Sequence, residues 1–223
     1  MPLLRDSGYQ ELLALLQRAM TGELSEQGWH DAIASLLRPA YLAAETPWAG
    51  SGKGGTEADW IQARGGVAYA LDQDGTFLDV GCANGFLMEC LPTWSGAHGF
   101  HVEPYGLDVV AEFVDLARSR LPQWQDRIWL GNVMTWQPPQ KFTYVRAGLE
   151  YVLPWRRLEL VVRLATTFVA PGGRLVLGPM SEPISQPLTQ TFLNAHGLIV
   201  AGINEREHLV DDRMIYRTYW LDC

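Results

Sequence analysis

The chain has 223 residues, enough for one domain with a sizeable core, and its 25 acidic against 17 basic residues give a net charge of −8. This balance argues against a partner bound mainly through phosphate contacts, which need clustered Lys and Arg. The three cysteines lack the spacing of a zinc site or a disulfide framework, no apolar run could span a bilayer, and the first residues lack a signal-peptide pattern, so we expect a cytoplasmic globular protein without a metal site.

Residues 1–72 are predicted to form a helical N-terminal cap. Apolar residues recur at helical spacing over 9–20, which predicts a first helix. A second helix is predicted to begin after Ser25, a residue type favoured at N-caps, and to end at Arg38 because Pro39 follows.

A glycine-rich loop and a third helix complete the cap. Four glycines within 50–55 predict a mobile loop suited to a lid, whereas a phosphate-binding loop would need a preceding strand. The third helix is predicted to begin after Thr56, with Asp59 completing a capping box, and to end near Leu71. Trp60, just inside this helix, is a candidate to cover a ligand, with core packing as the alternative.

From residue 76 onward, short apolar strands alternate with amphipathic helices. This alternation predicts βαβ units, a parallel sheet and an α/β fold. The last two strands are separated by few residues and predict an antiparallel hairpin. The predicted strands are Thr76–Val80, Tyr105–Leu107, Arg127–Leu130, Phe142–Ala147, Arg174–Leu177, Leu198–Ile203 and Met214–Leu221. The predicted helices are Phe86–Leu91, 110–117, 158–169 and 187–196, and a long loop is expected over Pro92–Pro104.

The first of these strands runs into the glycine turn Asp79-Val80-Gly81-Cys82-Ala83-Asn84-Gly85. Gly81 lets the backbone approach a ligand, and Gly85 lets the next helix start close to the strand. A dinucleotide site would have the spacing GxGxxG, but here the spacing is GxxxG and Ala83 stands where the middle glycine would be. The carboxylate of Asp79 also suits a ligand with an ammonium group better than one with a pyrophosphate.

This turn resembles the first motif of class I S-adenosylmethionine-dependent methyltransferases, D/E-x-G-x-x-x-G. The resemblance implies that this loop holds the methionine end of the cofactor, with Asp79, Gly81, Cys82, Ala83 and Gly85 lining it. It also implies a Rossmann-like three-layer sandwich with a seven-stranded, mostly parallel sheet in the order 3-2-1-4-5-7-6 and an antiparallel strand seven. Residues 73–223 would form this cofactor-binding domain, in one compact unit with the cap.

Two further segments extend the resemblance. Asp108 ends the second strand, where a carboxylate can accept both ribose hydroxyls, and Val109 follows it. Gly131-Asn132-Val133 resembles the family's G-D-A/V turn at the adenine. The oxygen of Asn132 can still accept a hydrogen bond there, and the backbone N–H of Val133 would face adenine N1.

The fourth and fifth strands also match the family pattern. Ala147 and Gly148 fall where the fourth strand would meet the cofactor. Pro171-Gly172-Gly173 resembles the structural turn into the fifth strand. The resemblance covers about residues 76–221, with all of its parts in the right order.

The methyl acceptor is expected to approach over the ends of strands four and five. Glu150 and Tyr151 follow the fourth strand and are, with Trp60, candidate substrate-facing residues. Arg146 could bind a substrate carboxylate, or it could pair with Glu150 or Asp79. No catalytic base is assigned, because methyl transfer depends mainly on positioning and desolvation, and His30 is interpreted as a helix-face residue.

The sequence therefore predicts a methyltransferase that uses S-adenosylmethionine and transfers a methyl group in line to an oxygen or nitrogen of a small molecule. Two alternatives stay open: a nicotinamide-dependent oxidoreductase, and a non-catalytic protein that binds the cofactor. A nucleic-acid methyltransferase is disfavoured by the acidic balance and by the absence of an N/D-P-P-F/Y motif after the fourth strand. The identity of the acceptor and the oligomeric state are not predicted.

Overall fold

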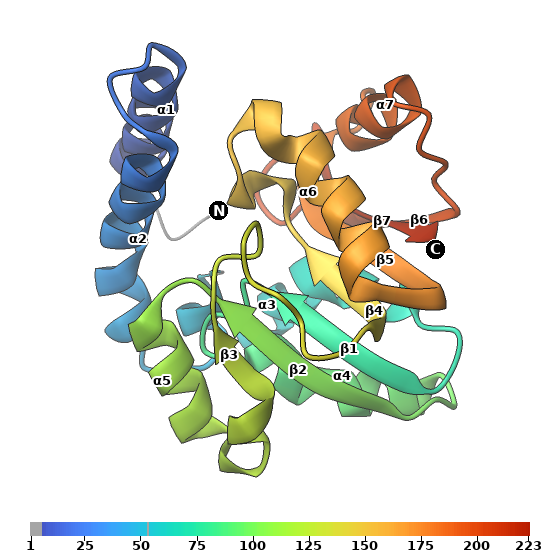
Figure 1. Cartoon of the computed structure of the whole chain (residues 1–223). Coiled ribbons are helices and arrows are strands. Elements are labelled where there is room, and N and C mark those ends of the chain that lie inside the picture. Colours follow the sequence, from blue (N-terminus) through green and yellow to red (C-terminus); the bar gives the residue numbers. More distant parts are fainter. Residues whose placement is uncertain (1–5, 53) are drawn as a thin grey trace.

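The computed structural model describes residues 6–52 and 54–223; residues 1–5 and Lys53, which fall within the predicted cap and lid, lie outside this range. A seven-stranded sheet runs through the centre of the molecule (Figure 1). Its strands are β1 (Gly75–Val80), β2 (Val102–Asp108), β3 (Ile128–Leu130), β4 (Phe142–Ala147), β5 (Val169–Pro183), β6 (Gly202–Glu207) and β7 (Met214–Asp222). The helices are α1 (Asp6–Met20), α2 (Glu26–Leu42), α3 (Glu57–Arg64), α4 (Phe86–Ala97), α5 (Ala111–Arg120), α6 (Arg157–Arg163) and α7 (Leu188–Ala195).

The sheet has the order β3-β2-β1-β4-β5-β7-β6, which confirms the predicted topology. Strands β1 to β5 pair in parallel, and β7 pairs antiparallel with both β5 and β6. Helices cover both faces, with α6 in front of the sheet and α3 and α4 behind it in Figure 1. The fold is thus the predicted three-layer α/β sandwich.

Both faces of the central strands are buried, as is typical of a parallel sheet. Leu78 and Val145 belong to the apolar cluster that includes residues of α6, whereas Phe77 and Tyr144 belong to the cluster with residues of α3 and α4. All four side chains have no exposed surface. Because side chains alternate along a strand, this packing fixes which face each polar residue at the strand ends must occupy.

Two helices run through prolines that were predicted to lie at or beyond their ends. Helix α2 ends at Leu42 rather than Arg38, and α4 ends at Ala97 rather than Leu91, so much of the predicted loop 92–104 is helical. Pro39 removes the hydrogen bond to the carbonyl of Ser35, which is an exposed residue that water can reach. In α4, packing of residues on both sides of Pro92 against the sheet outweighs the helix-breaking tendency of proline.

Other boundaries differ where strand pairing extends beyond the local pattern. Strand β5 begins at Val169 rather than Arg174, so Pro171-Gly172-Gly173 forms an irregularity within it, with Gly172 at φ +76°. Strand β2 begins at Val102, three residues before its prediction. Strand β6 spans Gly202–Glu207 instead of 198–203, because these are the residues that pair with β7, from Gly202 opposite Trp220 to Glu207 opposite Ile215.

The third helix of the cap begins as predicted but changes geometry earlier than expected. Thr56 and Asp59 form the reciprocal capping box, and Ser25 accepts a hydrogen bond from a backbone N–H at the start of α2. After Arg64 the chain tightens into a 3₁₀ turn over Gly65–Ala70 instead of continuing as an α-helix to Leu71.

Helices α1 and α2 form an antiparallel pair at one side of the molecule (Figure 1). Two ion pairs tie α2 to the remainder of the fold: Glu26 with Arg156, at 2.6 Å, and Arg38 with Glu112, at 3.2 Å. The pair lies beside the carboxyl ends of the strands, where it forms a wall.

None of the helices in the described part of the chain is long and apolar enough to cross a membrane.

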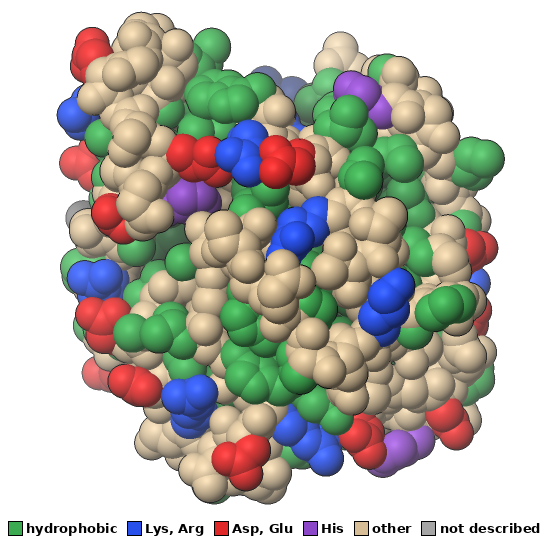
Figure 2. All heavy atoms as spheres, viewed as in Figure 1, with side chains coloured by type: hydrophobic (Ala, Val, Ile, Leu, Met, Phe, Trp, Pro, Cys, Tyr) green, Lys and Arg blue, Asp and Glu red, His purple; other side chains and the backbone are tan. Residues whose placement is uncertain are grey.

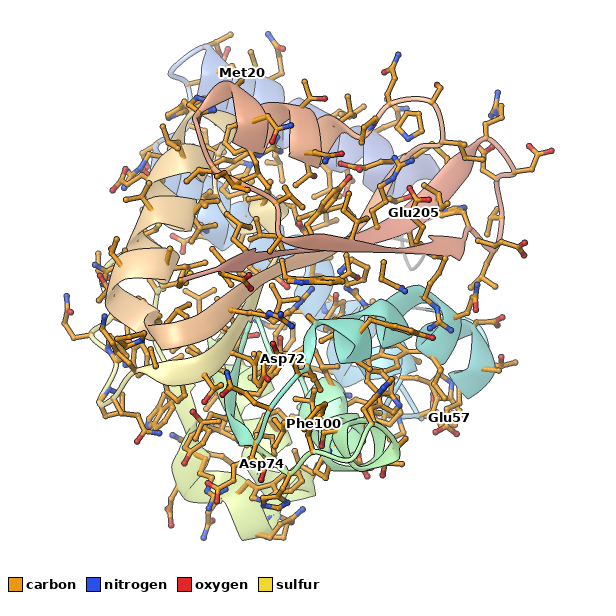
Figure 3. All side chains as sticks on the ribbon, turned by 90° about the vertical axis from the view of Figure 1, so that its right-hand side faces the viewer. Met20, Glu57, Asp72, Asp74, Phe100 and Glu205 are labelled. Carbon is orange, nitrogen blue, oxygen red and sulfur yellow. The ribbon has the colours of Figure 1, made fainter. Side chains whose placement is uncertain are left out.

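The opposite end of the sheet is closed by local hydrogen bonds. Asp72, Asp74 and Phe100, labelled in Figure 3, mark the loops that precede β1 and β2. Asp74 accepts a hydrogen bond from the backbone of His101 at 2.7 Å, which joins these two loops. The carboxyl ends of the strands are the ones that open into a cavity.

Candidate functional site

A cavity of about 360 Å³ lies between the carboxyl ends of the strands and the N-terminal helices. Its size and position match those of ligand sites in open α/β sheets. Residues following β1, β2, β3 and β4 line one side, and residues of α1, α2 and α3 line the other. The predicted residues among the lining are Trp60, Asp79, Gly81, Cys82, Ala83, Asp108, Val109, Asn132, Val133, Arg146, Glu150 and Tyr151.

The turn after β1 needs its glycines for two separate reasons. Gly81 has φ +74°, and a Cβ on it would lie 2.7 Å from Cζ of Tyr151, so a ring covers this glycine. Ala83 is a non-glycine residue at φ +48°, an uncommon conformation. Gly85, at φ +78°, brings the start of α4 against Leu121, and it does not line the cavity.

Asp108 ties this turn to the end of β2. Its two carboxylate oxygens accept hydrogen bonds from the backbone N–H groups of Ala83, at 2.8 Å, and Val110, at 2.9 Å. Burial raises the pKa of Asp108 to about 6, and these two hydrogen bonds oppose the shift. A carboxylate has about four acceptor positions, so Asp108 retains acceptor capacity toward the cavity. Burial also raises the pKa of Cys82, which therefore carries a neutral thiol here.

The turn after β3 presents one backbone donor to the cavity. Oδ1 of Asn132 accepts a hydrogen bond from the backbone N–H of Met134 at 2.9 Å, which makes this side chain part of the turn. The carbonyl of Val133 accepts from Nε of Arg163, also at 2.9 Å. Within the described residues, the N–H of Val133 donates no hydrogen bond.

A buried ion pair joins the ends of β1 and β4. Nη1 of Arg146 donates to Oδ1 of Asp79 at 3.1 Å and to the hydroxyl of Tyr151 at 2.8 Å, while Nε donates to the carbonyl of Gly178 at 2.6 Å. Of the three interpretations given for Arg146, the structure shows pairing with Asp79. Burial raises the pKa of Asp79, and the adjacent guanidinium opposes that shift.

Three side chains at this end of the cavity carry nitrogen donors that have no acceptor among the described residues. Nη2 of Arg146 is buried and makes no hydrogen bond with the described part of the chain, and the same holds for Nε1 of Trp60. Arg64, one turn after Trp60 on α3, also lines the cavity and forms no ion pair with any described residue. An unpaired buried guanidinium N–H is costly, so this group of donors is suited to receive an anionic ligand group.

No protein-family model and no curated protein sequence matches this chain. Among solved structures, the N-methyltransferase NodS of Bradyrhizobium japonicum WM9, in complex with S-adenosyl-L-homocysteine, is 17% identical with a TM-score of 0.59, over 84% of this chain and 96% of that chain. An S-adenosylmethionine-dependent methyltransferase of Geobacter sulfurreducens, also with S-adenosyl-L-homocysteine, is 15% identical with a TM-score of 0.52, over 83% and 96%.

A third solved structure matches a larger share of this chain. Phosphoethanolamine N-methyltransferase 1 of Haemonchus contortus, bound to phosphoethanolamine and S-adenosylhomocysteine, is 13% identical with a TM-score of 0.64, over 91% of this chain and 51% of that chain. The chain has the fold of class I S-adenosylmethionine-dependent methyltransferases. At these identities the comparisons establish the fold alone, and the site must be argued from its own residues.

Two further residues predicted from the methyltransferase resemblance lie outside the cavity lining. Ala147 is completely buried, and Gly148 gives room for the carboxylate of Glu150, which folds back to within 2.5 Å of where a Cβ would be. Glu150 itself lines the cavity and is exposed. Tyr151, whose pKa is raised by burial, is fixed between Arg146 and Gly81.

Trp60 combines both roles that were considered for it. It packs against Phe86, with ring centroids 4.6 Å apart, and is 1% exposed, yet it also borders the cavity. The glycine-rich loop beside it is held in place by two hydrogen bonds, from Asn84 to the carbonyl of Pro47 at 2.8 Å and from Trp48 to the carbonyl of Gly55 at 3.1 Å.

Several lining residues were not predicted as site residues, among them His30, Tyr41 and Arg64. Tyr41 stacks on Phe113 with ring centroids 5.0 Å apart, and burial raises its pKa. It was missed because α2 was predicted to end before Pro39. Arg64 had a local signal, because it lies four residues after the candidate Trp60 and therefore on the same helix face.

The surface around the site carries no extended basic patch on the face seen in Figure 2, where acidic and basic side chains are interspersed. Binding to a nucleic-acid backbone would require Lys and Arg clustered on one face. This face therefore offers no support for the nucleic-acid alternative.

Proposed function

We propose that the protein is an S-adenosylmethionine-dependent methyltransferase acting on a small molecule. The observation that carries this proposal is that three separate segments of the sequence converge on a single cavity. They contribute Asp79 with the turn 81–83, Asp108, and Asn132. In the proposal, residues 73–223 form the cofactor-binding domain and residues 1–72 form a cap over it.

The methionine end of the cofactor would be held as an amino-acid zwitterion. Its carboxylate would accept hydrogen bonds from the donors that lack partners, on Trp60, Arg64 and Arg146. Asp79 would attract the ammonium group, because among the described residues only its Oδ1 accepts a hydrogen bond from Arg146. This arrangement supports an α-amino acid ligand over a pyrophosphate, which carries no ammonium group.

The nucleoside end would occupy the turns after β2 and β3. Asp108 would accept the ribose hydroxyls with its remaining acceptor positions, and Val109 would lie beside the ring. The free N–H of Val133 would donate to adenine. Asn132 would act through its amide nitrogen or its second lone pair, because one acceptor position already serves the turn.

When bound, S-adenosylmethionine supplies a methyl group activated by the adjacent sulfonium. The chain's own contribution is to orient the two reactants in line and to exclude water, and both effects lower the barrier without a covalent intermediate. Tyr151, stacked over Gly81 and fixed by Arg146, would form the boundary between cofactor and acceptor. The acceptor atom in this proposal is an oxygen or a nitrogen.

The oxidoreductase alternative has weaker support at the same turn. A dinucleotide site binds the pyrophosphate through free N–H groups of a glycine-rich turn and the following helix. Here the N–H of Ala83 is already bound by Asp108, and the N–H groups of Gly81 and Gly85 donate to the carbonyls of Leu107 and Cys82. The non-catalytic alternative is separated from the proposal by turnover.

Calorimetric titration with S-adenosylhomocysteine and, separately, with NADH tests the cofactor. We expect binding of the former only, with affinity that falls as the pH drops through about 6, because ribose hydroxyls prefer the ionised form of Asp108. The Asp108→Asn variant should bind more weakly and lose this pH dependence. Binding of NADH alone would overturn the proposal. Release of S-adenosylhomocysteine from methyl-labelled cofactor with a panel of small molecules then distinguishes an enzyme from a binding protein.

A further inference from the structure

The two sides of the cavity differ in chemistry. The sheet side carries Asp79, Asp108 and Asn132, whereas the side formed by α1 and α2 carries mainly aliphatic groups. The aliphatic side chains of this helical wall are Leu12, Leu13, Leu16, Ile33, Ala34 and Leu37, and the rings of Trp29, His30 and Tyr41 line it as well. Positions i, i+1 and i+4 in each aliphatic set lie on one face of each helix.

The leucines and isoleucine of this wall are only partly covered by the protein. Leu13 is 43% exposed, and the others are of intermediate exposure, so a continuous apolar stripe faces the cavity. Burying apolar surface is favourable, so a ligand with apolar surface is stabilised by contact with this stripe. No Lys, Arg, Asp or Glu of α1 or α2 is among the described residues that line the cavity.

His30 is the polar exception within the aliphatic stripe. Its Nε2 atom is buried without a hydrogen-bond partner, and its ring packs edge-on against Trp29 with centroids 4.9 Å apart. Burial lowers the pKa of His30, an effect opposed by the carboxylates of Glu26 and Asp31 and supported by Arg156. The imidazole is therefore neutral near pH 7, with one nitrogen that donates and one that accepts.

A hydroxyl group complements either tautomer of this imidazole, because it can both donate and accept. An anionic group would meet no Lys or Arg of α1 or α2 among the described residues that line the cavity. Arg157, which lines the cavity from the other side, donates through Nε to the carbonyl of Leu149 at 3.2 Å.

We propose that the wall formed by α1 and α2 is the acceptor site, and that it takes an uncharged, largely apolar molecule whose hydroxyl group hydrogen-bonds to Nε2 of His30. The proposal rests on the proposed function, because it assigns the sheet side of the same cavity to the cofactor. It names the substrate class that the cavity recognises and makes His30 a substrate-binding residue.

The test uses 2-naphthol as the probe, titrated into the full chain saturated with S-adenosylhomocysteine. We expect 2-naphthol to bind at least tenfold more tightly than 2-naphthyl phosphate. It should also bind about three- to tenfold more tightly than 2-methoxynaphthalene, which cannot donate a hydrogen bond. His30→Leu should abolish the preference for 2-naphthol over the methyl ether, and His30→Gln should retain part of it. Ser35→Ala, on α2 but outside the cavity, is the matched control and should behave as the unmodified protein.

Tighter binding of the phosphate than of 2-naphthol, or an unchanged preference in His30→Leu, would overturn the acceptor assignment. Circular dichroism of each variant checks that it is folded. If S-adenosylhomocysteine does not bind, the proposed function fails, and titration of 2-naphthol into the protein alone then tests the helical wall. If 2-naphthol binds to the protein alone and His30→Leu weakens that binding, the apolar site is supported independently of the cofactor. If 2-naphthol does not bind, or binds without regard to His30, the apolar site is overturned.

Discussion

Two buried arginine–carboxylate pairs lie within the described residues, and they differ in how completely their hydrogen bonds are satisfied. Arg146 pairs with Asp79 at the cavity, and Arg217 pairs with Glu182 between β5 and β7. The four residues are 2–4% exposed, so both pairs have lost most of their contact with water. Burial of a charged pair is costly unless further hydrogen bonds complete it, which makes the remaining partners informative.

The pair under α7 is complete. All three nitrogens of Arg217 donate, with Nε bound to Glu205 at 2.7 Å and Nη2 to the carbonyl of Ile184 at 2.8 Å. Glu205, labelled in Figure 3, stands on the hairpin that closes the sheet. Glu182 accepts from the hydroxyl of Tyr219 at 2.5 Å and from Thr189 at 2.6 Å.

The pair at the cavity is incomplete, because Nη2 of Arg146 has no acceptor among the described residues. A network in which every donor and acceptor is paired leaves no group free to bind a ligand, whereas an unpaired donor can still bind one. We therefore propose a structural role for Arg217 and a binding role for Arg146, although both are buried arginines in adjacent regions of one sheet.

The largest expected effect is on stability, when the complete pair is broken. Arg217→Met leaves the carboxylate of Glu182 buried without its cation, which should lower the free energy of unfolding by about 3–5 kcal/mol. Urea denaturation followed by circular dichroism measures the change. The affinity of the folded fraction for S-adenosylhomocysteine should stay the same, because Arg217 does not line the cavity.

The double variant Glu182→Leu, Arg217→Met provides the control. Replacing both charges with apolar groups removes the unpaired carboxylate, so it should be more stable than Arg217→Met alone. A single variant that loses less than about 1 kcal/mol would contradict the structural role assigned to this pair.

Much of the fold follows from local sequence patterns. The strand-to-helix turn at 79–85, the carboxylate at the end of β2 and the amide after β3 are each recognisable within a few residues. Because parallel strands end at the same edge of the sheet, their convergence on one cavity could be predicted from the strand assignments alone. The capping box at Thr56 followed from an equally local pattern, and the sheet order followed from the resemblance to the methyltransferase family.

The remainder of the site depends on how distant elements pack. The choice of Asp79 as the partner of Arg146 depends on the register between β1 and β4, which pairs these two residues directly. The contributions of His30 and Tyr41 depend on how α2 docks, and no local pattern records that. The predicted limits of β5 and β6 were wrong for the same reason. Pairing with β7 extends β5 beyond its apolar run and shifts β6 along the chain.

The next effect is on binding, when the fork of Arg146 is replaced by a single ammonium group. Arg146→Lys keeps the charge beside Asp79 but cannot place a second donor where Nη2 lies. A hydrogen bond to a charged group contributes about 1.5–3 kcal/mol, so the affinity for S-adenosylhomocysteine should fall about 10- to 100-fold, measured by calorimetry. Arg217→Lys, at the complete pair, is the matched control and should leave the affinity unchanged. Equal losses of affinity in both variants would contradict the binding role.

The smallest expected effect comes from removing one hydroxyl from each pair. Tyr219→Phe deletes the hydrogen bond to Glu182 and should lower the free energy of unfolding by about 1 kcal/mol without changing the affinity for S-adenosylhomocysteine. Tyr151→Phe deletes the hydroxyl that accepts from Nη1 of Arg146 and keeps the ring over Gly81. The affinity of this variant for S-adenosylhomocysteine should fall about three- to tenfold, because the guanidinium loses one of the hydrogen bonds that orient Nη2 toward the ligand. Chemical denaturation and calorimetry on both variants separate the two effects. If Tyr151→Phe lost only stability, the open pair would be no more than a second structural network, and the distinction between the two regions would fail.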